Sequence, residues 1–363
     1  MRRLVLVGAG HAHVQVLRDW IDAPLPDVEL VLVSPSRFAP YSGMVPGWLQ
    51  GVYRFDEIGI DAGALAHAAA ARFIEDEVIA IELAEPLVRL RRHDPLRCDV
   101  VSLNVGSTLY PPAGMRGRLL SMRPLGGLRE SWDALLAGLD AREQGARRVI
   151  AAGAGPAGVE SIFATMARLR AQQPGVRVEG LLVTKDDEIL PGHAPAVRRA
   201  VLRALRAAGA SVATGTDAAS IETRDADIVL WATGAQALRW PRESGLDVDD
   251  QGFVRIDANL RSTSHPAVFA VGDCAAWSTP LPKAGVVPVR QGPALAHNLR
   301  AALTGAAMSA YAPQRRHLAL LSTADGRAIA SWGPWSASGH WVWRWKDRID
   351  RRFVRRFATG GAA

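Results

Sequence analysis

The stretch that decides the fold is LVLVGAGHAHVQVL, residues 4–17. It begins with four apolar residues, as in a buried parallel strand, and apolar residues then recur at helical spacing. Gly8 permits a tight turn between the two patterns, and Gly10 lets the backbone approach a phosphate at the positive end of the helix. The stretch therefore predicts a strand, a loop and a helix that bind a dinucleotide pyrophosphate, with His13 in place of the third glycine of that fingerprint.

The two histidines of the same stretch raise a different interpretation, a metal site. His11 and His13 are two residues apart at the start of the expected helix, so their side chains point in different directions. Helical metal ligands usually stand three or four residues apart, as in metalloproteases. We therefore predict no metal site in this chain.

A second copy of the fingerprint occurs in RRVIAAGAGPAGVES, residues 147–161. It places Gly153, Gly155 and Gly158 after an apolar strand, and Glu160 follows on the expected helix. Two fingerprints, each between a strand and a helix, are more specific than either alone. The alternative is two glycine-rich turns in an ordinary α/β protein. Two dinucleotide sites in one chain predict two cofactors that exchange electrons.

Length, cysteines and charge narrow the class further. A chain of 363 residues is too long for one core, and we expect two or more domains. Its two cysteines, Cys98 and Cys274, form no CxxC motif, which excludes a disulfide scaffold and indicates a reducing, cytoplasmic setting. We expect no signal peptide and no membrane span. The net charge of +7 is not accompanied by a nucleic-acid-binding motif, so no nucleic-acid partner is predicted.

The rest of the chain continues the alternation of strands and helices. The segment SPSRFAPYSGMVPGWLQG, residues 34–51, is rich in Pro, Gly and Ser, and we expect an irregular binding loop there. Other expected elements are short strands over 72–104, a helix over 127–143, a second strand–loop–helix series over 147–234, and a buried strand in HPAVFAVGDCA (265–275) that ends in Gly272 and Asp273.

Taken together, these motifs resemble the two-dinucleotide-binding-domain flavoproteins, which include disulfide reductases, type II NADH:quinone dehydrogenases and sulfide:quinone oxidoreductases. The resemblance covers nearly the whole chain. It rests on both glycine loops, on DVVSLNVGS (99–107) and ADIVLWATGA (226–235), and on AVFAVGDCA (267–275). More narrowly, GHAHVQVL, SPSRFAPYSGMVPG and SLNVGS look like the flavoprotein module found fused to selenophosphate synthetase.

The resemblance implies an α/β fold with two Rossmann-like domains of the three-layer ββα type and a small aromatic and basic C-terminal unit. It implies an FAD-binding domain in two parts, 1–112 and 241–312, an inserted NAD(P)H-binding domain, 113–240, and the C-terminal unit, 313–363. A homodimer is also compatible with it.

For FAD, the resemblance implies a non-covalent site in the first domain. Asp273 would accept hydrogen bonds from the ribityl chain, or else act as an N-cap. A helix starting near Val287 would place its dipole at the reduced flavin. Lys283 is a weak catalytic candidate, with a solvated loop lysine as the alternative. The implied FAD residues are Gly8, Gly10, His11, Ala12, Ser34, Arg37, Pro40, Ser42, Val78, Val105, Gly106, Gly272, Asp273, Val287 and Pro288.

For NAD(P)H, the resemblance implies a site around the second glycine loop. An Asp or Glu usually binds the adenosine ribose at the end of the second strand of such a domain. Ser34 stands there in the first domain and Thr184 in the second. Lys185 could accept a 2′-phosphate and favour NADPH, or be an exposed loop residue. The implied residues are Gly153, Gly155, Pro156, Ala157, Gly158, Glu160, Thr184, Lys185, Thr233 and Gly234.

The cysteines separate this chain from part of that superfamily. Disulfide reductases need a vicinal redox pair, and sulfide:quinone enzymes need cysteines that carry sulfur. We expect Cys98 and Cys274 to be buried small hydrophobes. The prediction is therefore hydride transfer from NAD(P)H to FAD and electron transfer to an acceptor, such as a quinone. The alternative is an FAD-binding module that docks a selenophosphate synthetase-like protein with little turnover.

The tail suggests where an acceptor could be reached. In WVWRWKDRIDRRFVRRF, residues 341–357, seven residues are basic and two acidic, a net +5. Apolar residues recur at helical spacing at Val342, Trp345, Ile349, Phe353 and Phe357. Such a helix is typical of a membrane interface, here the anionic inner face of the plasma membrane. The alternative is a terminal helix whose aromatic face closes over its own flavin domain.

Overall fold

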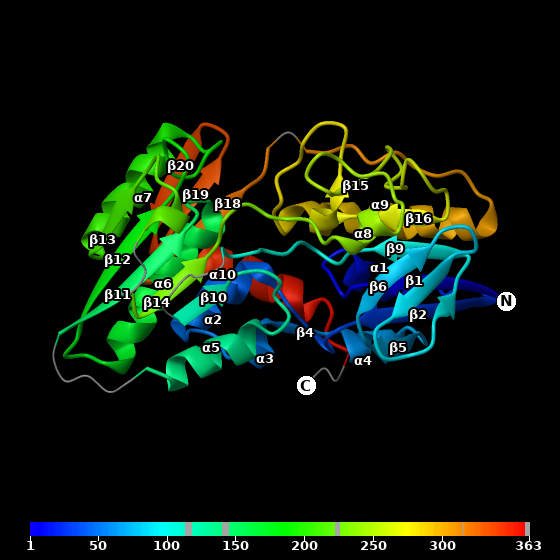
Figure 1. The fold of residues 1–363 in the computed structure, drawn as a ribbon, viewed down its shortest axis with the longest axis horizontal. Coiled ribbons are helices and arrows are strands. Elements are labelled where there is room, and N and C mark those ends of the chain that lie inside the picture. Colours follow the sequence, from blue (N-terminus) through cyan, green and yellow to red (C-terminus); the bar gives the residue numbers. More distant parts are fainter. Residues whose placement is uncertain (113–117, 140–144, 222–225, 315, 360–363) are drawn as a thin grey trace.

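Two five-stranded parallel sheets form the two halves of the molecule, which lie side by side in Figure 1. The structure is a computed structural model and describes residues 1–112, 118–139, 145–221, 226–314 and 316–359. The predicted domain boundary at 112/113 adjoins residues outside this description, and the predicted helix end at 140–143 lies outside it.

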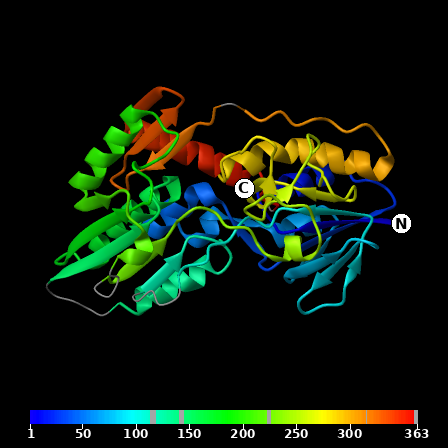
Figure 2. The same ribbon diagram turned by 45° about the horizontal axis from the view of Figure 1, so that its top comes forward.

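The first sheet has the strand order β16-β9-β1-β2-β5. Each of residues 4–7 of β1 is at most 2% exposed, and since successive side chains of a strand alternate, both faces of the sheet are covered. Helices α1 and α9 cover one face and the antiparallel strands β6, β7 and β8 cover the other (Figure 2). The bounds are β1 (Arg2–Val7), β2 (Val28–Ser34), β5 (Arg72–Glu75), β9 (Val100–Leu103), β16 (Val268–Ala270), α1 (His13–Asp22), α9 (Val286–Thr304), β6 (Val78–Glu82), β7 (Leu87–Leu90) and β8 (Leu96–Arg97).

The second sheet has the order β10-β14-β11-β12-β13, and its long helix α6 follows the second glycine loop. Its apolar strands again indicate a sheet buried on both faces. The α/β fold with two Rossmann-like halves is therefore confirmed. The bounds are β10 (Arg118–Ser121), β11 (Ala146–Ala152), β12 (Arg177–Val183), β13 (Ala210–Ala213), β14 (Ile228–Trp231), α5 (Leu128–Ala137), α6 (Pro156–Gln172) and α7 (Pro195–Ala207).

The segment predicted as an irregular loop, 34–51, is partly helical. After β3 the chain enters the short helices η1 and α2, and α2 packs on α6. Trp48 and Leu49 are buried there, because apolar residues of α2 complete the core of the second half. The binding loop is therefore shorter than predicted. The bounds are β3 (Phe38–Pro40), η1 (Ser42–Met44), α2 (Val45–Gln50), α3 (Phe55–Ile58), β4 (Gly59–Asp61) and α4 (Ala62–Ala68).

The C-terminal residues form a three-stranded antiparallel sheet followed by α10. Val342, near the start of α10, is buried against this sheet, whereas Phe357, just after its end, is buried in the core of the first half. The helix, drawn red in Figure 1, thus crosses from one half to the other. The bounds are β18 (Ala319–Ser322), β19 (Ala328–Trp332), β20 (Trp335–Gly339) and α10 (His340–Arg355).

The apolar residues predicted to form one buried stripe along α10 are only partly buried. Val342 and Phe357 are at most 2% exposed, but Trp345 and Ile349 are 39% and 38% exposed. Of the remaining short elements, η2 (Ala218–Ser220) packs on the second sheet. The others connect the two halves or edge the first: α8 (Trp240–Glu243), β15 (Val254–Arg255), η3 (Gly272–Cys274) and β17 (Ala275–Ala276).

Candidate active site

Both glycine loops open into one cleft of about 2700 Å³ between the two halves. Of the residues implied for FAD, eleven line it: Gly8, Gly10, His11, Ser34, Pro40, Ser42, Val78, Val105, Gly106, Asp273 and Pro288. Of those implied for NAD(P)H, nine line it: Gly153, Gly155, Pro156, Ala157, Glu160, Thr184, Lys185, Thr233 and Gly234. The folding of the chain therefore brings most of the predicted site residues together.

Asn104, a residue that the sequence analysis did not identify, holds the first glycine loop through buried hydrogen bonds. Its Oδ1 accepts hydrogen bonds from the backbone N–H of Ala12 at 3.0 Å and of His13 at 3.3 Å, and its Nδ2 donates to the Val271 carbonyl at 3.1 Å. A Cβ on Gly10 would overlap the Asn104 side chain. The Asn104 side chain alone thus requires a glycine at position 10, and the approach of a phosphate to Gly10 stays a prediction.

His13 replaces the fingerprint's third glycine and makes two buried hydrogen bonds. Its Nδ1 lies 2.6 Å from the Gly8 carbonyl and its Nε2 lies 2.8 Å from the Ser102 hydroxyl. A carbonyl only accepts, so Nδ1 carries the proton and Nε2 accepts from Ser102. Burial lowers the pKa of His13 to about 4. The imidazole is therefore neutral at pH 7 and ties the helix to the loop.

His11 belongs to the same loop, and its ring lies next to aromatic residues from two distant segments of the chain. Its ring centroid is 5.3 Å from that of Tyr41 and 6.0 Å from that of Phe353 on α10. Burial lowers its pKa to about 4, although Asp273 opposes the shift. The terminal helix thus packs over the first glycine loop, in agreement with the alternative interpretation of the tail.

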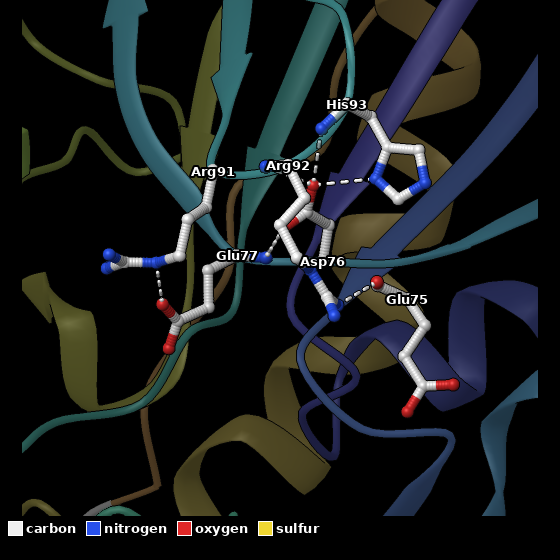
Figure 3. A network of polar contacts seen from close by, with 6 residues as sticks. All are labelled: Glu75, Asp76, Glu77, Arg91, Arg92 and His93. Carbon is white, nitrogen blue, oxygen red and sulfur yellow. Dashed lines mark hydrogen bonds and ion pairs between the residues drawn. The ribbon is translucent and has the colours of Figure 1, made fainter.

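The buried carboxylate of Asp76 holds a segment of the cleft wall, and Figure 3 shows it close to Glu77, Arg92 and His93. Asp76 accepts hydrogen bonds from the backbone N–H groups of Glu77, Arg92 and His93 at 2.8–3.0 Å, and from His93 Nδ1 at 2.7 Å. Although burial opposes it, these bonds hold the pKa of Asp76 well below its ordinary value. The loop from Asp76 to Val78 is therefore held rigidly along the cleft wall.

Four of the residues implied for FAD do not line the cleft. Arg37 forms a bidentate ion pair with Asp61, with nitrogen–oxygen distances of 2.8–3.1 Å. The other three residues lie beneath the surface of the cleft. Ala12 is buried, and the backbone N–H of Gly272 donates to Gln291. Val287 is buried beside Gly272. A site inferred from motif position alone cannot separate residues that touch the cleft from those that support it.

Asp273 and Lys283 both line the cleft, and a contact of Asp273 with the ribityl chain stays a prediction. Asp273 makes no N-cap bond; its carboxylate pairs with Arg123, which sequence reasoning also missed. Lys283 Nζ donates to the carbonyls of Asp273 at 3.0 Å and Ala275 at 2.7 Å, and stands 3.6 Å from the ring centroid of Phe253. Lys283 is thus half-buried and ties the loop before α9 to the Asp273–Ala275 segment, and its catalytic role stays a prediction.

The second glycine loop keeps all three glycines for distinct reasons. A Cβ on Gly153 would overlap the Ala232 carbonyl, and one on Gly158 would overlap the Gly153 carbonyl. Gly158 therefore lies behind the loop and allows close packing of helix and strand. Nothing occupies the space a Cβ on Gly155 would need, which leaves the N-terminus of α6 accessible to a pyrophosphate.

Two carboxylates, those of Asp186 and Asp217, lie beside Thr184 and Lys185 at the end of β12, where the sequence offers Thr184 in place of the usual Asp or Glu. Lys185 Nζ lies 3.0 Å from Asp217 Oδ2, with 73% and 47% of the two side chains exposed. Thr184 donates its hydroxyl to Asp186 at 3.2 Å. The positive charge of Lys185 is thus already matched by a carboxylate that follows the next strand.

Glu160, predicted to contact NAD(P)H, belongs to a cluster of charged groups on the cleft wall. Its carboxylate accepts from the Ser322 N–H at 2.8 Å. Lys346 on α10 donates to the Gly43 carbonyl at 2.5 Å and to Asp350 at 2.7 Å. Burial raises the pKa of Glu160 to about 7, with Lys346 and Ser322 opposing. A pKa of about 7 leaves Glu160 partly protonated near neutrality, and its bond to Ser322 joins the second half to the C-terminal residues.

Both cysteines are buried away from the cleft. The Cys98 thiol donates to the Pro86 carbonyl at 3.4 Å and the Cys274 thiol to the Val271 carbonyl at 3.2 Å. Burial raises the pKa of Cys98 to about 12 and that of Cys274 to about 11. Neither thiol is reactive, because the thiolate is the nucleophile. Within the described ranges no group of three or more His, Cys, Asp or Glu is placed to hold a metal ion.

Two Rossmann-type cradles that share one cleft define a class of enzyme with two dinucleotide cofactors. The chain belongs to the pyridine nucleotide-disulphide oxidoreductase family, whose model matches residues 2–302. This family is FAD-dependent and uses NADH or NADPH, and these are the cofactors of this chain. The open space at Gly155 and the cleft that both glycine loops line fit such ligands.

Solved structures share the fold across almost the whole chain. The sulfide:quinone oxidoreductase of the hyperthermophilic bacterium Aquifex aeolicus has a TM-score of 0.80 and 16% identity, covering 100% of this chain and 93% of that one. A NAD-dependent persulfide reductase from A. fulgidus has a TM-score of 0.74 and 18% identity, covering 91% and 64%. The water-forming NADH oxidase from Lactobacillus brevis has a TM-score of 0.69 and 20% identity, covering 92% and 75%. At these identities the likeness establishes the fold. A search of curated protein sequences gives no match.

Proposed function

We propose that this protein takes hydride from NAD(P)H onto FAD and passes the electrons to an acceptor without a redox-active cysteine. One observation carries the proposal: both glycine loops line one cleft, and both cysteines lie outside it with raised pKa values. When bound, FAD supplies the hydride-accepting chemistry. The chain supplies the two cradles, the neutral His11 and His13, and the helix terminus that begins at Val286.

We assign residues 1–112 and 241–312 to the FAD-binding domain, 113–240 to the NAD(P)H-binding domain and 313–363 to the C-terminal unit. The strands of the first sheet support this division, because they come from residues 2–103 and 268–270. Those of the second come from 118–231. The flavin half is thus interrupted by the nucleotide half.

For the donor, the structure favours NADH. Asp186 and Asp217 flank Lys185 at the end of the cradle, and a 2′-phosphate would meet both carboxylates. Ribose hydroxyls, by contrast, can donate to them. This proposal differs from the prediction that Lys185 favours NADPH, and the two predict opposite preferences for the wild-type protein.

For the acceptor, a quinone fits best. The cleft wall near the first loop is apolar and aromatic, with Pro40, Tyr41, Pro46, Ile349 and Phe353, as suits a flat apolar ring. The solved structure with a TM-score of 0.80 is named for a quinone. Glu160, whose pKa is about 7, lines the same cleft and can provide the proton that quinone reduction needs.

The C-terminal unit would bring the protein to the lipid that holds such a quinone. Its exposed apolar side chains, here called the aromatic surface, are Trp332, Trp335, Trp341, Trp345 and Ile349, each 38–70% exposed. In the described part of the chain no helix is long and apolar enough to cross a bilayer. We infer that the aromatic surface contacts an anionic inner membrane face, because exposed tryptophans beside basic residues are typical of interfacial helices.

A comparison of acceptors tests this proposal. With NADH as the donor, the FAD-loaded protein should reduce a short-chain ubiquinone analogue faster than a low-molecular-weight disulfide. The variant Cys98→Ala with Cys274→Ala should do the same. Activity confined to the disulfide and lost in this variant would contradict the proposal.

The second candidate is an FAD-binding module that docks a selenophosphate synthetase-like protein. The aromatic surface favours it, because exposed tryptophans are typical of protein contacts. The same surface could also join two copies of this chain. Protein that binds FAD but is reduced by neither NADH nor NADPH would favour this module.

A further inference from the structure

Arg123 links the two halves of the molecule at the flavin side of the cleft. It follows β10, an edge strand of the second sheet, and its own carbonyl accepts from Ser121 Oγ at 2.6 Å. Its guanidinium donates to the carboxylate of Asp273, to the hydroxyl of Ser107 and, at 3.0 Å, to the carbonyl of Lys283. The backbone thus belongs to one half and all three acceptors belong to the other.

The contacts of Arg123 are partly buried, and they depend on the planar guanidinium group of arginine. Only 26% of the Arg123 side chain and 13% of the Asp273 side chain are exposed, so solvent screens the pair weakly. A planar guanidinium can donate to three acceptors at fixed angles, which the point charge of lysine cannot do. Ser107 and Asp273 follow β9 and β16, and Lys283 precedes α9. The Arg123 side chain therefore binds three separate segments of the proposed FAD-binding domain.

We propose that Arg123 is a positioning residue that orients Asp273 toward FAD and fixes the nucleotide half against the flavin half. The proposal rests on the proposed function for its second part only. Loss of the guanidinium leaves the Asp273 carboxylate without its charged partner, free to turn away from the cleft. It also removes a bond between the halves, whose relative angle sets the approach of nicotinamide to flavin.

Titration of the apoprotein with FAD, followed by flavin fluorescence, tests the first part. We expect Arg123→Met to weaken FAD binding at least tenfold and Arg123→Lys to weaken it less. Asp273→Asn should also weaken it, and the double variant Arg123→Met with Asp273→Asn should be no weaker than the worse single variant. Arg118→Met, an exposed arginine at the start of the same strand, is the matched control and should bind as wild type.

Anaerobic reduction at saturating FAD tests the second part. We expect Arg123→Met to lower the rate of flavin reduction by NADH at least tenfold while KM for NADH changes less than twofold. If Arg123→Met does not fold, as judged by circular dichroism, the Lys variant gives the same comparison.

Wild-type FAD affinity and wild-type reduction rate in both Arg123 variants would overturn the proposal. Additive losses in the double variant would overturn the link to Asp273. Failure of the proposed function gives a different result: wild-type protein that binds FAD but is not reduced by NADH. In that case the titration still decides whether Arg123 orients Asp273.

Discussion

His13 shows how one residue can replace another with quite different chemistry in the same motif. A glycine at this position normally lets helix and strand pack closely, and Gly158 does so in the second cradle. In the first cradle the imidazole fills the space and bonds Gly8 and Ser102. The departure from the fingerprint is therefore compensated locally, and the loop keeps its shape.

A pH dependence of stability follows from this histidine. Its folded-state pKa of about 4 lies below the ordinary 6.5, so the unfolded chain binds more protons between these values. Stability present above pH 6.5 is then lost as the pH falls toward 4. Between pH 7 and pH 5 we expect His13 to account for a loss on the order of 1–2 kcal/mol in the free energy of unfolding.

Urea denaturation at both pH values measures this loss. His13→Gln should be less stable than wild type at pH 7 but should show a flatter pH dependence. His297→Gln, at an exposed histidine of α9, serves as control. An identical slope in wild type and His13→Gln would show that His13 does not titrate as described.

We expect single residues around the end of β12 to set the choice between NADH and NADPH. Asp217→Ala should release Lys185 from its ion pair and remove a negative charge, so the ratio of kcat/KM for NADPH to that for NADH should rise severalfold. Asp217→Ala with Lys185→Ala should lose most of that gain. Steady-state kinetics with both nucleotides provide the ratios, and no change in the ratio for Asp217→Ala would exclude a role in selectivity.

Among the elements, α10 is the one whose position could not be read from its own sequence. The helix itself is predicted, because its apolar residues recur at helical spacing. The split of its stripe depends on partners far away: Tyr41 meets Phe353, and Gly43 accepts from Lys346. A helix with one face over the cleft and another in solvent looks, in sequence, like one continuous amphipathic surface.

Two variants separate the packing role of this unit from the membrane role. Ending the chain after Gly339 should lower stability and release FAD, since Val342 and Phe357 are buried. Trp341→Ala with Trp345→Ala should leave FAD bound but weaken co-sedimentation with anionic phosphatidylserine vesicles. Binding of the intact protein should fall with salt, because the Debye length shrinks to about 3 Å at 1 M.

Intact protein that stays in the supernatant at low salt would contradict the membrane role. The aromatic surface would then be better assigned to a protein partner. A truncated chain that keeps its FAD and its stability would contradict the packing role.

At the scale of the whole molecule, the two cradles were predictable and the residues that join them were not. Each glycine loop is a local pattern of strand, turn and helix, so its chemistry can be inferred from about fifteen consecutive residues. Asn104, Arg123 and Lys346 reach the site from segments far from either glycine loop in the sequence, and no pattern assigned them these contacts. Their roles depend on how the sheets meet, which spacing along the chain does not encode.

The Glu160 cluster joins all three parts of the molecule and predicts a pH dependence of turnover. With a pKa of about 7, Glu160 is protonated below that value, so kcat for quinone reduction should fall as the pH rises from 6 to 8. Glu160→Gln should have a lower kcat, at least tenfold, with little pH dependence in this range. A wild-type pH profile in Glu160→Gln would exclude it as the proton donor.

The most direct measurement of the central claim is anaerobic titration of the purified, FAD-loaded protein with NADH, followed by absorbance. We predict loss of the oxidised flavin band with one equivalent of NADH per FAD, and the same result in the variant Cys98→Ala with Cys274→Ala. Recovery of the band on addition of a short-chain quinone should follow. An unbleached flavin with excess NADH and NADPH, or bleaching that disappears with the cysteines, would contradict the account.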